Sequence, residues 1–225
     1  MNNISTKKSR QRGIYLLPNL FTIGSFFAGF FAIIASFKGN YEVAAIAIFI
    51  AMIMDSLDGR VARLTNTITA FGAEFDSLAD MVSFAVAPAL LAYTWGLSAF
   101  GKFGWLSAFI YMVAVALRLA RFNTQVGSVD KRYFQGIPCP AAAAVVTSFI
   151  WICSDFEIFS KPAALILAII MIVVGVLMVS NVRFRSFKDA ELKDHVRFVV
   201  ILIAVLVFVL ITFDPSKVLF VVFAG

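Results

Sequence analysis

Four aspartates in two short stretches of the chain are the residues best suited to chemistry. They are Asp55, Asp58, Asp76 and Asp80. The spacing within each pair, three and four residues, places its members on one face of a helix. Four carboxylates that face one cavity repel one another, so they must either hold protons or share cations. Oxygen ligands without His or Cys suit a hard cation such as Mg²⁺, Mn²⁺ or Ca²⁺.

Small residues and one arginine accompany these aspartates. Gly59, Ala62 and Gly72 remove side-chain bulk beside the acids, which permits close helix packing or close approach of a ligand. Arg63 adds a guanidinium, whose planar fork of donors suits phosphate. At 3.6 residues per turn, Gly59, Ala62 and Arg63 share an arc of roughly 140° with the first two aspartates. Acids, small residues and arginine together describe a pyrophosphate site.

The elements that position these residues are expected to be transmembrane helices. Of the 225 residues, 61% are hydrophobic and 14% are charged, and the mean hydropathy is +0.94. This composition lies outside the range of soluble domains. The apolar residues form runs of about 20, the length that crosses a bilayer. A charged side chain that faces lipid costs about 3 kcal/mol or more, so intramembrane acids normally face a polar interior and perform a function.

Seven spans are predicted from the apolar runs. They lie near residues 17–37, 42–62, 77–97, 104–122, 139–154, 162–180 and 196–213. Pro18 and Pro162 stand where a helix is expected to begin. Residues 218–225 are too short to cross the bilayer and form either a half-span or an interfacial tail. One domain over residues 1–225 is the simplest interpretation.

Basic residues predict the orientation, since Lys and Arg near helix ends are retained on the cytoplasmic side. With a cytoplasmic N-terminus and alternating spans, 15 of the 19 basic residues fall on the inner side. The outer side receives only Lys38, Lys102, Lys161 and Lys217. We therefore expect a multi-pass protein of the cell's inner (plasma) membrane, with the aspartates near the cytoplasmic face. Because the basic residues are spread over loops without a binding fold, they argue against nucleic acid as a partner.

The motif resembles that of the CDP-alcohol phosphotransferase family. Residues Asp55 to Arg63, eight further residues, and then Gly72, Asp76 and Asp80 match the pattern DxxDGxxAR(x8)GxxxDxxxD at every fixed position. The motif covers 26 residues. The spans around it resemble the six-helix core of this family with an additional C-terminal helix or helices. The resemblance implies an all-α, polytopic helical bundle in the membrane.

The resemblance also implies a role for each motif residue. The four aspartates would hold Mg²⁺ or Mn²⁺ around the pyrophosphate of a CDP-linked donor, and Asp80 would also be the general base. Gly59, Ala62 and Gly72 match positions that let the nucleotide approach, and Arg63 matches a phosphate contact. The implied reaction is attack of an alcohol hydroxyl on the lipid-linked phosphorus, with CMP leaving.

Segments outside the motif resemble the phosphatidylserine synthase branch of the family, which joins CDP-diacylglycerol to L-serine. They are Ser83–Ala89, Arg118–Asn123 and Phe134–Ala141. Arg118, Arg121 and Asn123 are the candidate contacts to the acceptor or to a lipid phosphate, since either anion can engage a guanidinium. The alternative is that the two arginines only anchor their helix at the headgroup layer.

Three functions stay open on the sequence. The leading one is a phosphatidylserine synthase, whose partners are CDP-diacylglycerol, L-serine and membrane lipids, with a homodimer left open. A second enzyme would keep the metal site and use glycerol 3-phosphate or another alcohol. The third is an ion-coupled transporter, in which intramembrane aspartates mark a pathway. The acids cluster near one face with Gly, Ala and Arg in register, which favours an enzyme.

Overall fold

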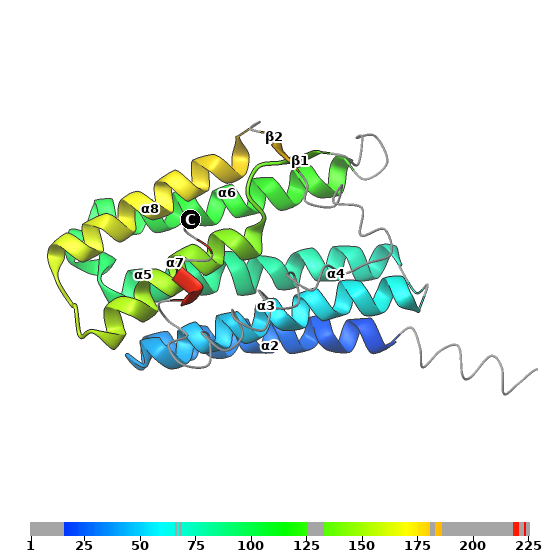
Figure 1. Ribbon diagram of the computed structural model, residues 1–225, viewed down its shortest axis with the longest axis horizontal. Coiled ribbons are helices and arrows are strands. Elements are labelled where there is room, and N and C mark those ends of the chain that lie inside the picture. The colour runs from blue at the N-terminus through cyan, green and yellow to red at the C-terminus, as the bar shows by residue number, and fades with distance from the viewer. Residues whose placement is uncertain are drawn as a thin grey trace, which may run out of the picture.

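The computed structural model describes residues 16–65, 67, 69–125, 133–180, 183–185, 218–220 and 223. Within these ranges the chain is almost entirely helical (Figure 1). The helices are α2 (Leu16–Phe37), α3 (Tyr41–Leu64), α4 (Ala70–Asp80), α5 (Ala87–Trp95), α6 (Lys102–Gln125), α7 (Cys139–Asp155) and α8 (Lys161–Val179). A π-helical segment, Met81–Val86, joins α4 to α5, and a 3-10 turn, Leu97–Phe100, follows α5.

The all-α membrane bundle predicted from the sequence is confirmed. Four helices are long and apolar enough to cross a membrane, namely Pro18–Phe37, Ala70–Trp95, Lys102–Thr124 and Lys161–Val179. The helices α3 and α7 match two further predicted spans closely. The third span begins at Ala70, seven residues earlier than the predicted start at residue 77. The prediction began too late because the acidic motif lowers the hydropathy of the first turns of this helix. The seventh span, 196–213, lies outside the described residues.

Small residues along one face of α2 allow its neighbours to approach closely. Thr22, Ser25 and Ala32 on this face are buried, whereas Phe27 and Phe30 on the other face are 66% and 51% exposed. This division is typical of membrane helices, which place small residues at helix contacts and large apolar ones toward lipid. The buried face packs against α3, α4, the π-helical segment and α5.

The π-helical segment that follows the last aspartate of the motif is held from two sides. A Cβ atom at Gly29 of α2 would lie 2.5 Å from Ser83 Oγ, so only glycine permits this crossing. The Ser83 hydroxyl donates to the Ser25 carbonyl oxygen at 3.0 Å. From α6, the buried Tyr111 hydroxyl donates to the Phe84 carbonyl oxygen at 2.8 Å. π-Helical turns are frequent at functional sites, and this one joins the acidic helix to the bundle core.

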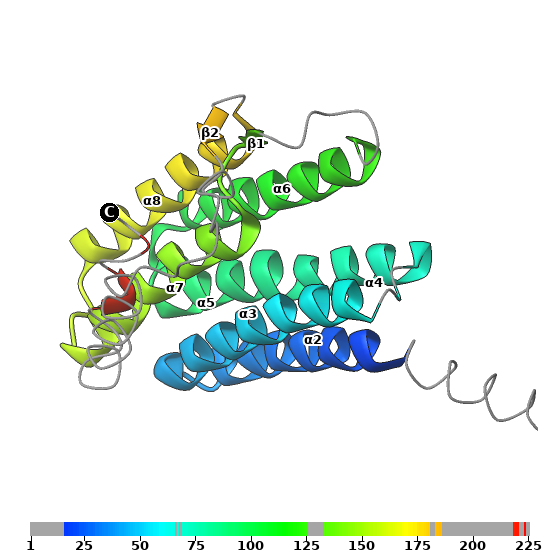
Figure 2. The same ribbon diagram turned by 45° about the vertical axis from the view of Figure 1, so that its right-hand side comes forward.

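The helices α6 and α8 lie side by side, and α7 packs against α3, α5 and α8 (Figure 2). Two short strands, β1 (Tyr133–Gln135) and β2 (Arg183–Arg185), pair antiparallel and connect the segment before α7 to the segment after α8. Gly136 follows β1 with φ of +77°, and a Cβ atom there would overlap the Met178 carbonyl oxygen. The start of α7 is therefore fixed beside the end of α8 by backbone contacts.

Candidate metal centre

Three of the four predicted aspartates meet between α3 and α4. Carboxylate oxygens of Asp55, Asp76 and Asp80 all lie within 4.8 Å of one another, and the three side chains are half-buried. Asp55 comes from the second half of α3, whereas Asp76 and Asp80 stand one turn apart on α4. The structure thus brings together residues that their helical spacing placed on facing stripes, while their individual roles stay predictions.

This group of carboxylates fits a divalent cation. Asp80 Oδ1 is buried and has no hydrogen-bond partner within the described part of the chain. A buried polar atom without a partner is costly, so this oxygen is suited to a partner from outside the protein, such as a cation or a substrate hydroxyl. An all-oxygen set of ligands matches the preference of Mg²⁺ and Mn²⁺. The aspartates can therefore hold a metal.

Asp58, the fourth predicted ligand, lies outside this group of three. Its side chain is buried, with 5% of its surface exposed, and its Oδ2 accepts a hydrogen bond from Thr22 Oγ1 at 2.7 Å. Thr22 belongs to α2 and is also buried. Sequence reasoning did not include Thr22, although a threonine within an apolar span is a sign of a polar contact between helices.

Arg63, the predicted phosphate contact, is exposed at the end of α3. Its guanidinium extends back along the helix to Gly59. A Cβ atom built at Gly59 would lie 3.4 Å from Arg63 Nη1. Ala62 is half-buried on the same stretch of helix. The absence of a side chain at Gly59 therefore leaves the guanidinium room beside the acids, where it is accessible to an anionic ligand.

Gly72 lies in the first turn of α4, near the beginning of α2. Its backbone N–H donates to Thr69 Oγ1 at 3.0 Å, which caps the helix. A Cβ atom at Gly72 would lie 3.1 Å from this hydroxyl and 3.6 Å from Asn19 Oδ1 of α2. Glycine at this position thus keeps the capped turn close to α2.

Arg118 points into the protein interior, toward the start of α7. Its Nη1 donates to the sulfur of Cys139 at 3.3 Å, and its Nε is buried with no partner in the part of the chain that is described. Cys139 is 1% exposed. Both cysteines, Cys139 and Cys153, are free and buried. One nitrogen of the Arg118 guanidinium therefore lies inside the bundle.

The other two predicted acceptor contacts engage different helices. Arg121 Nη1 donates to the Val179 carbonyl oxygen at 3.5 Å, at the end of α8. The Asn123 amide nitrogen donates to Ser77 Oγ at 3.1 Å and to Glu74 Oε2 at 3.3 Å. Ser77 lies on α4 directly after Asp76, so the Asn123 side chain joins α6 to the helix that carries Asp76 and Asp80. Sequence reasoning missed Ser77.

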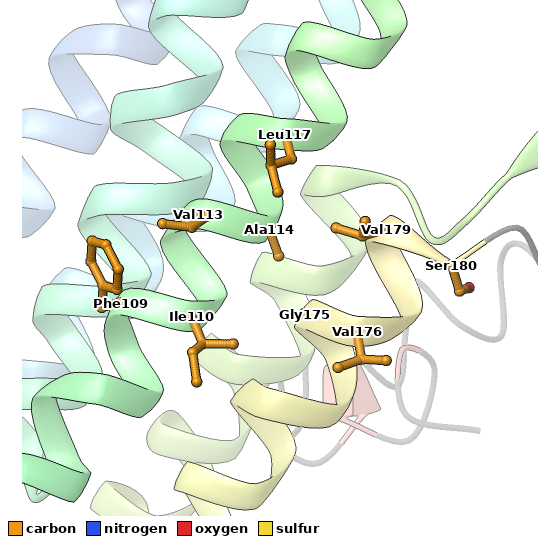
Figure 3. Close-up of a pocket in the computed structure, with 9 residues that line it drawn as sticks. All are labelled: Phe109, Ile110, Val113, Ala114, Leu117, Gly175, Val176, Val179 and Ser180. Carbon is orange, nitrogen blue, oxygen red and sulfur yellow. The ribbon is translucent and has the colours of Figure 1, made fainter.

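A separate apolar groove of about 470 Å³ lies between α6 and α8, as Figure 3 shows. Its lining consists of Phe109, Ile110, Val113, Ala114, Leu117, Gly175, Val176, Val179 and Ser180. Ser180 provides the single polar side chain of this lining. The groove therefore has neither the charge nor the donors needed to bind a cation or a pyrophosphate, and the polar chemistry belongs to the aspartate group.

Comparison with known proteins matches this chain to one family. The family model described as CDP-alcohol phosphatidyltransferase matches residues 15–224. The CDP-diacylglycerol–serine O-phosphatidyltransferase of Helicobacter pylori (strain ATCC 700392 / 26695) is 39% identical over 196 residues, which cover 87% of this chain and 83% of that protein. The Bacillus subtilis (strain 168) protein of the same description is 36% identical over 174 residues, covering 76% of this chain and 91% of its own.

Solved structures of one protein share the fold. The crystal structure of Mycobacterium tuberculosis phosphatidylinositol phosphate synthase with CDP-DAG bound has a TM-score of 0.56 and 20% sequence identity, and the match covers 74% of this chain and 80% of that one. A second structure of that protein, in complex with manganese and citrate, has a TM-score of 0.53, with 80% and 85% covered. These likenesses support the arrangement of helices.

Replacing Asp55 tests the metal centre directly. Asp55→Asn removes one negative charge from the group, so we expect the affinity of the purified protein for Mn²⁺ to fall about tenfold or more. The measurement is a titration of free Mn²⁺ by electron paramagnetic resonance in detergent. Glu74→Gln, which changes an exposed acid on α4 outside the group, is the matched control and should bind as the wild type does. Equal affinities for all three proteins would contradict the assignment.

Proposed function

Because the chain belongs to the CDP-alcohol phosphatidyltransferase family, we propose that it is a phosphatidylserine synthase, which transfers the phosphatidyl group of CDP-diacylglycerol to the L-serine hydroxyl and releases CMP. The observation that carries this proposal is the group of three carboxylates between α3 and α4. It lies in a chain that aligns over most of its length with proteins described as CDP-diacylglycerol–serine O-phosphatidyltransferases. The family match confirms the resemblance inferred from the motif.

The aspartates bind the cation that the donor requires. Asp55, Asp76 and Asp80 would hold Mg²⁺ or Mn²⁺, with Asp58 as the fourth ligand. When bound, the cation neutralises the pyrophosphate of CDP-diacylglycerol and the charge that develops on CMP. Placing the ligands on two packed helices fixes their separation before substrate arrives, so little reorganisation is needed.

Asp80 is the proposed general base. Its Oδ1 is buried and has no partner among the described residues, which makes this carboxylate the best placed to accept a proton from the serine hydroxyl. The π-helical segment that follows Asp80 is held from α2 and α6 by hydrogen bonds to Ser25 and from Tyr111. The position of the base along its helix is therefore constrained by two neighbouring helices.

The donor's phosphates and nucleotide are bound by the small residues and the arginine of the motif. Arg63 presents an exposed guanidinium next to Gly59, and a guanidinium binds phosphate oxygens in a bidentate manner. Gly59, Ala62 and Gly72 provide space in which the nucleotide can approach the backbone. The lipid part of the donor stays in the bilayer while its headgroup reaches the acids.

Arg118 is the proposed contact for the serine carboxylate. Its Nε is buried and offers a donor, and its Nη1 is already oriented by Cys139. A charge-assisted bond between guanidinium and carboxylate is strong enough to select an amino acid acceptor. Arg121 and Asn123 support this helix end through their contacts to α8 and α4.

The proposed orientation places the site at the cytoplasmic face of the plasma membrane. The beginning of α2, the junction of α3 with α4 and the end of α6 lie at one end of the bundle in Figures 1 and 2. Among the described residues, Arg60 and Arg63 lie near the end of α3, and Arg118 and Arg121 lie near the end of α6. Basic residues at one end of the spans are the distribution expected of a cytoplasmic side. A single domain inserted in this way would meet both the membrane-bound donor and the water-soluble acceptor.

A panel of acceptors tests the proposed function. The purified wild-type protein in detergent, given CDP-diacylglycerol and Mn²⁺, should release CMP and form phosphatidylserine with L-serine. It should form no phosphatidylglycerol phosphate with glycerol 3-phosphate, and a chelator should stop the reaction. Products are identified by mass spectrometry of the lipid. Product formed only from glycerol 3-phosphate would assign another acceptor, and absence of CMP release with either acceptor would contradict the enzymatic proposal.

Replacing Asp80 separates its role as base from that of a ligand. Asp80→Asn keeps the shape of the side chain and removes the proton acceptor, so CMP release should fall about a hundredfold or more. Excess Mn²⁺ should not restore the rate, whereas it should restore part of the rate of Asp55→Asn. Initial rates across a range of Mn²⁺ concentrations provide the measurement. Recovery of Asp80→Asn to the wild-type rate at high Mn²⁺ would assign the base elsewhere.

Replacing Arg118 tests the acceptor pocket. Arg118→Ala should raise the KM for L-serine about tenfold or more, since a charge-assisted hydrogen bond contributes roughly 1.5 to 3 kcal/mol. The KM for CDP-diacylglycerol should stay unchanged. Arg60→Ala, which removes an exposed arginine of α3, is the control. An unchanged KM for serine in Arg118→Ala would show that the serine carboxylate binds elsewhere.

A further inference from the structure

Thr22 of α2 contacts Asp58, one of the four aspartates of the motif. Thr22 Oγ1 lies 2.7 Å from Asp58 Oδ2 and 3.2 Å from the carbonyl oxygen of Pro18. Thr22 is 3% exposed and Asp58 is 5% exposed. A hydroxyl carries one proton, and the shorter contact, to a carboxylate, is the stronger bond. The hydroxyl therefore donates to Asp58.

The position of Thr22 is fixed by the packing of its helix. The buried face of α2 packs on α3 and also on the segment that follows Asp80, where Ser83 donates to the Ser25 carbonyl oxygen. Thr22 and Ser25 are successive buried residues of this face. A β-branched side chain in a helix has few rotamers, so the direction of the Thr22 hydroxyl is set by the backbone of α2. One face of α2 thus contacts both acidic helices.

We propose that Thr22 is a positioning residue of the metal centre. By holding one oxygen of Asp58, it directs the other oxygen of this carboxylate toward the cation held by Asp55, Asp76 and Asp80. Carboxylates that bind metals are commonly oriented by such hydrogen bonds, and losing one lowers metal affinity about 10- to 100-fold. This inference rests on the proposed function, in which Asp58 is the fourth ligand. It explains how an aspartate outside the group of three takes part in binding.

A purely structural role for the same bond makes a different prediction. If Thr22 only joined α2 to α3, its loss would lower the thermal stability and leave the metal affinity of the folded protein unchanged. If it positions Asp58, the metal affinity falls while the protein stays folded. Metal affinity and thermal unfolding, measured on the same samples, therefore distinguish the two roles.

The test compares three substitutions at buried hydroxyls of α2. Thr22→Val is close in shape to threonine and lacks the hydroxyl, and Thr22→Ser retains it. Ser36→Ala is the matched control, because the Ser36 hydroxyl is buried on the same helix and donates to its own helix at the Ala32 carbonyl oxygen. Mn²⁺ binding is measured by electron paramagnetic resonance on the purified full chain without substrates, and unfolding by a thermal melt without metal.

We expect Thr22→Val to weaken Mn²⁺ binding about tenfold or more, with Thr22→Ser and Ser36→Ala within about twofold of the wild type. In an Asp58→Asn background, Thr22→Val should have no further effect, since the two residues act through one bond. Thr22→Ala provides the same comparison if the valine variant does not fold. A folded Thr22→Val protein with wild-type affinity, or an equal loss in the Asp58→Asn background, would overturn the inference.

The outcome for the wild type separates this inference from the function on which it rests. If the wild-type protein binds Mn²⁺ and makes phosphatidylserine, a normal affinity in folded Thr22→Val removes only the role of Thr22. If the wild type binds no Mn²⁺, the metal centre itself is contradicted, and the positioning role is overturned with it.

Discussion

The mutual repulsion of carboxylates within an apolar bundle is the constraint on which the rest of the structure depends. Oxygens of three aspartates lie within 4.8 Å of one another between α3 and α4. Like charges at this separation repel strongly where water is scarce, and burial of an unpaired charge is costly. A divalent cation relieves the repulsion, and the same cation neutralises a diphosphate. The interaction that makes the buried acids tolerable is thus the one that the reaction needs.

The remaining helices hold this group in place. The small residues on α2 let it pack closely on both acidic helices, and Thr22 reaches one of the acids. The helix α6 contributes Asn123, which is tied to α4, and the inward-facing Arg118. The large apolar side chains of α2, such as Phe27, face outward, where lipid surrounds the chain. One set of helices therefore separates a polar site from the bilayer that supplies its donor.

Much of this arrangement could be predicted from the sequence, because helical spacing determines which residues share a face. The spacing of Asp76 and Asp80 predicted one stripe, and the structure places Asp55 against it. The bond between Thr22 and Asp58 joins residues 36 positions apart and depends on how two helices cross, which hydropathy does not encode. The π-helical segment was missed for a similar reason, since it is a change in hydrogen-bond register. The candidate acceptor residues Arg118, Arg121 and Asn123 are close in sequence on α6, but they contact three different helices. Their closeness in sequence therefore could not show whether they line one pocket.

The location of a bound metal ion is the most direct test of the central claim. Crystals of the purified protein grown with Mn²⁺ would be measured at a wavelength where manganese scatters anomalously. We predict an anomalous peak between α3 and α4, within coordination distance of the carboxylates of Asp55, Asp76 and Asp80. Carboxylates that point away from one another, or a peak that lies elsewhere in the protein, would contradict the account.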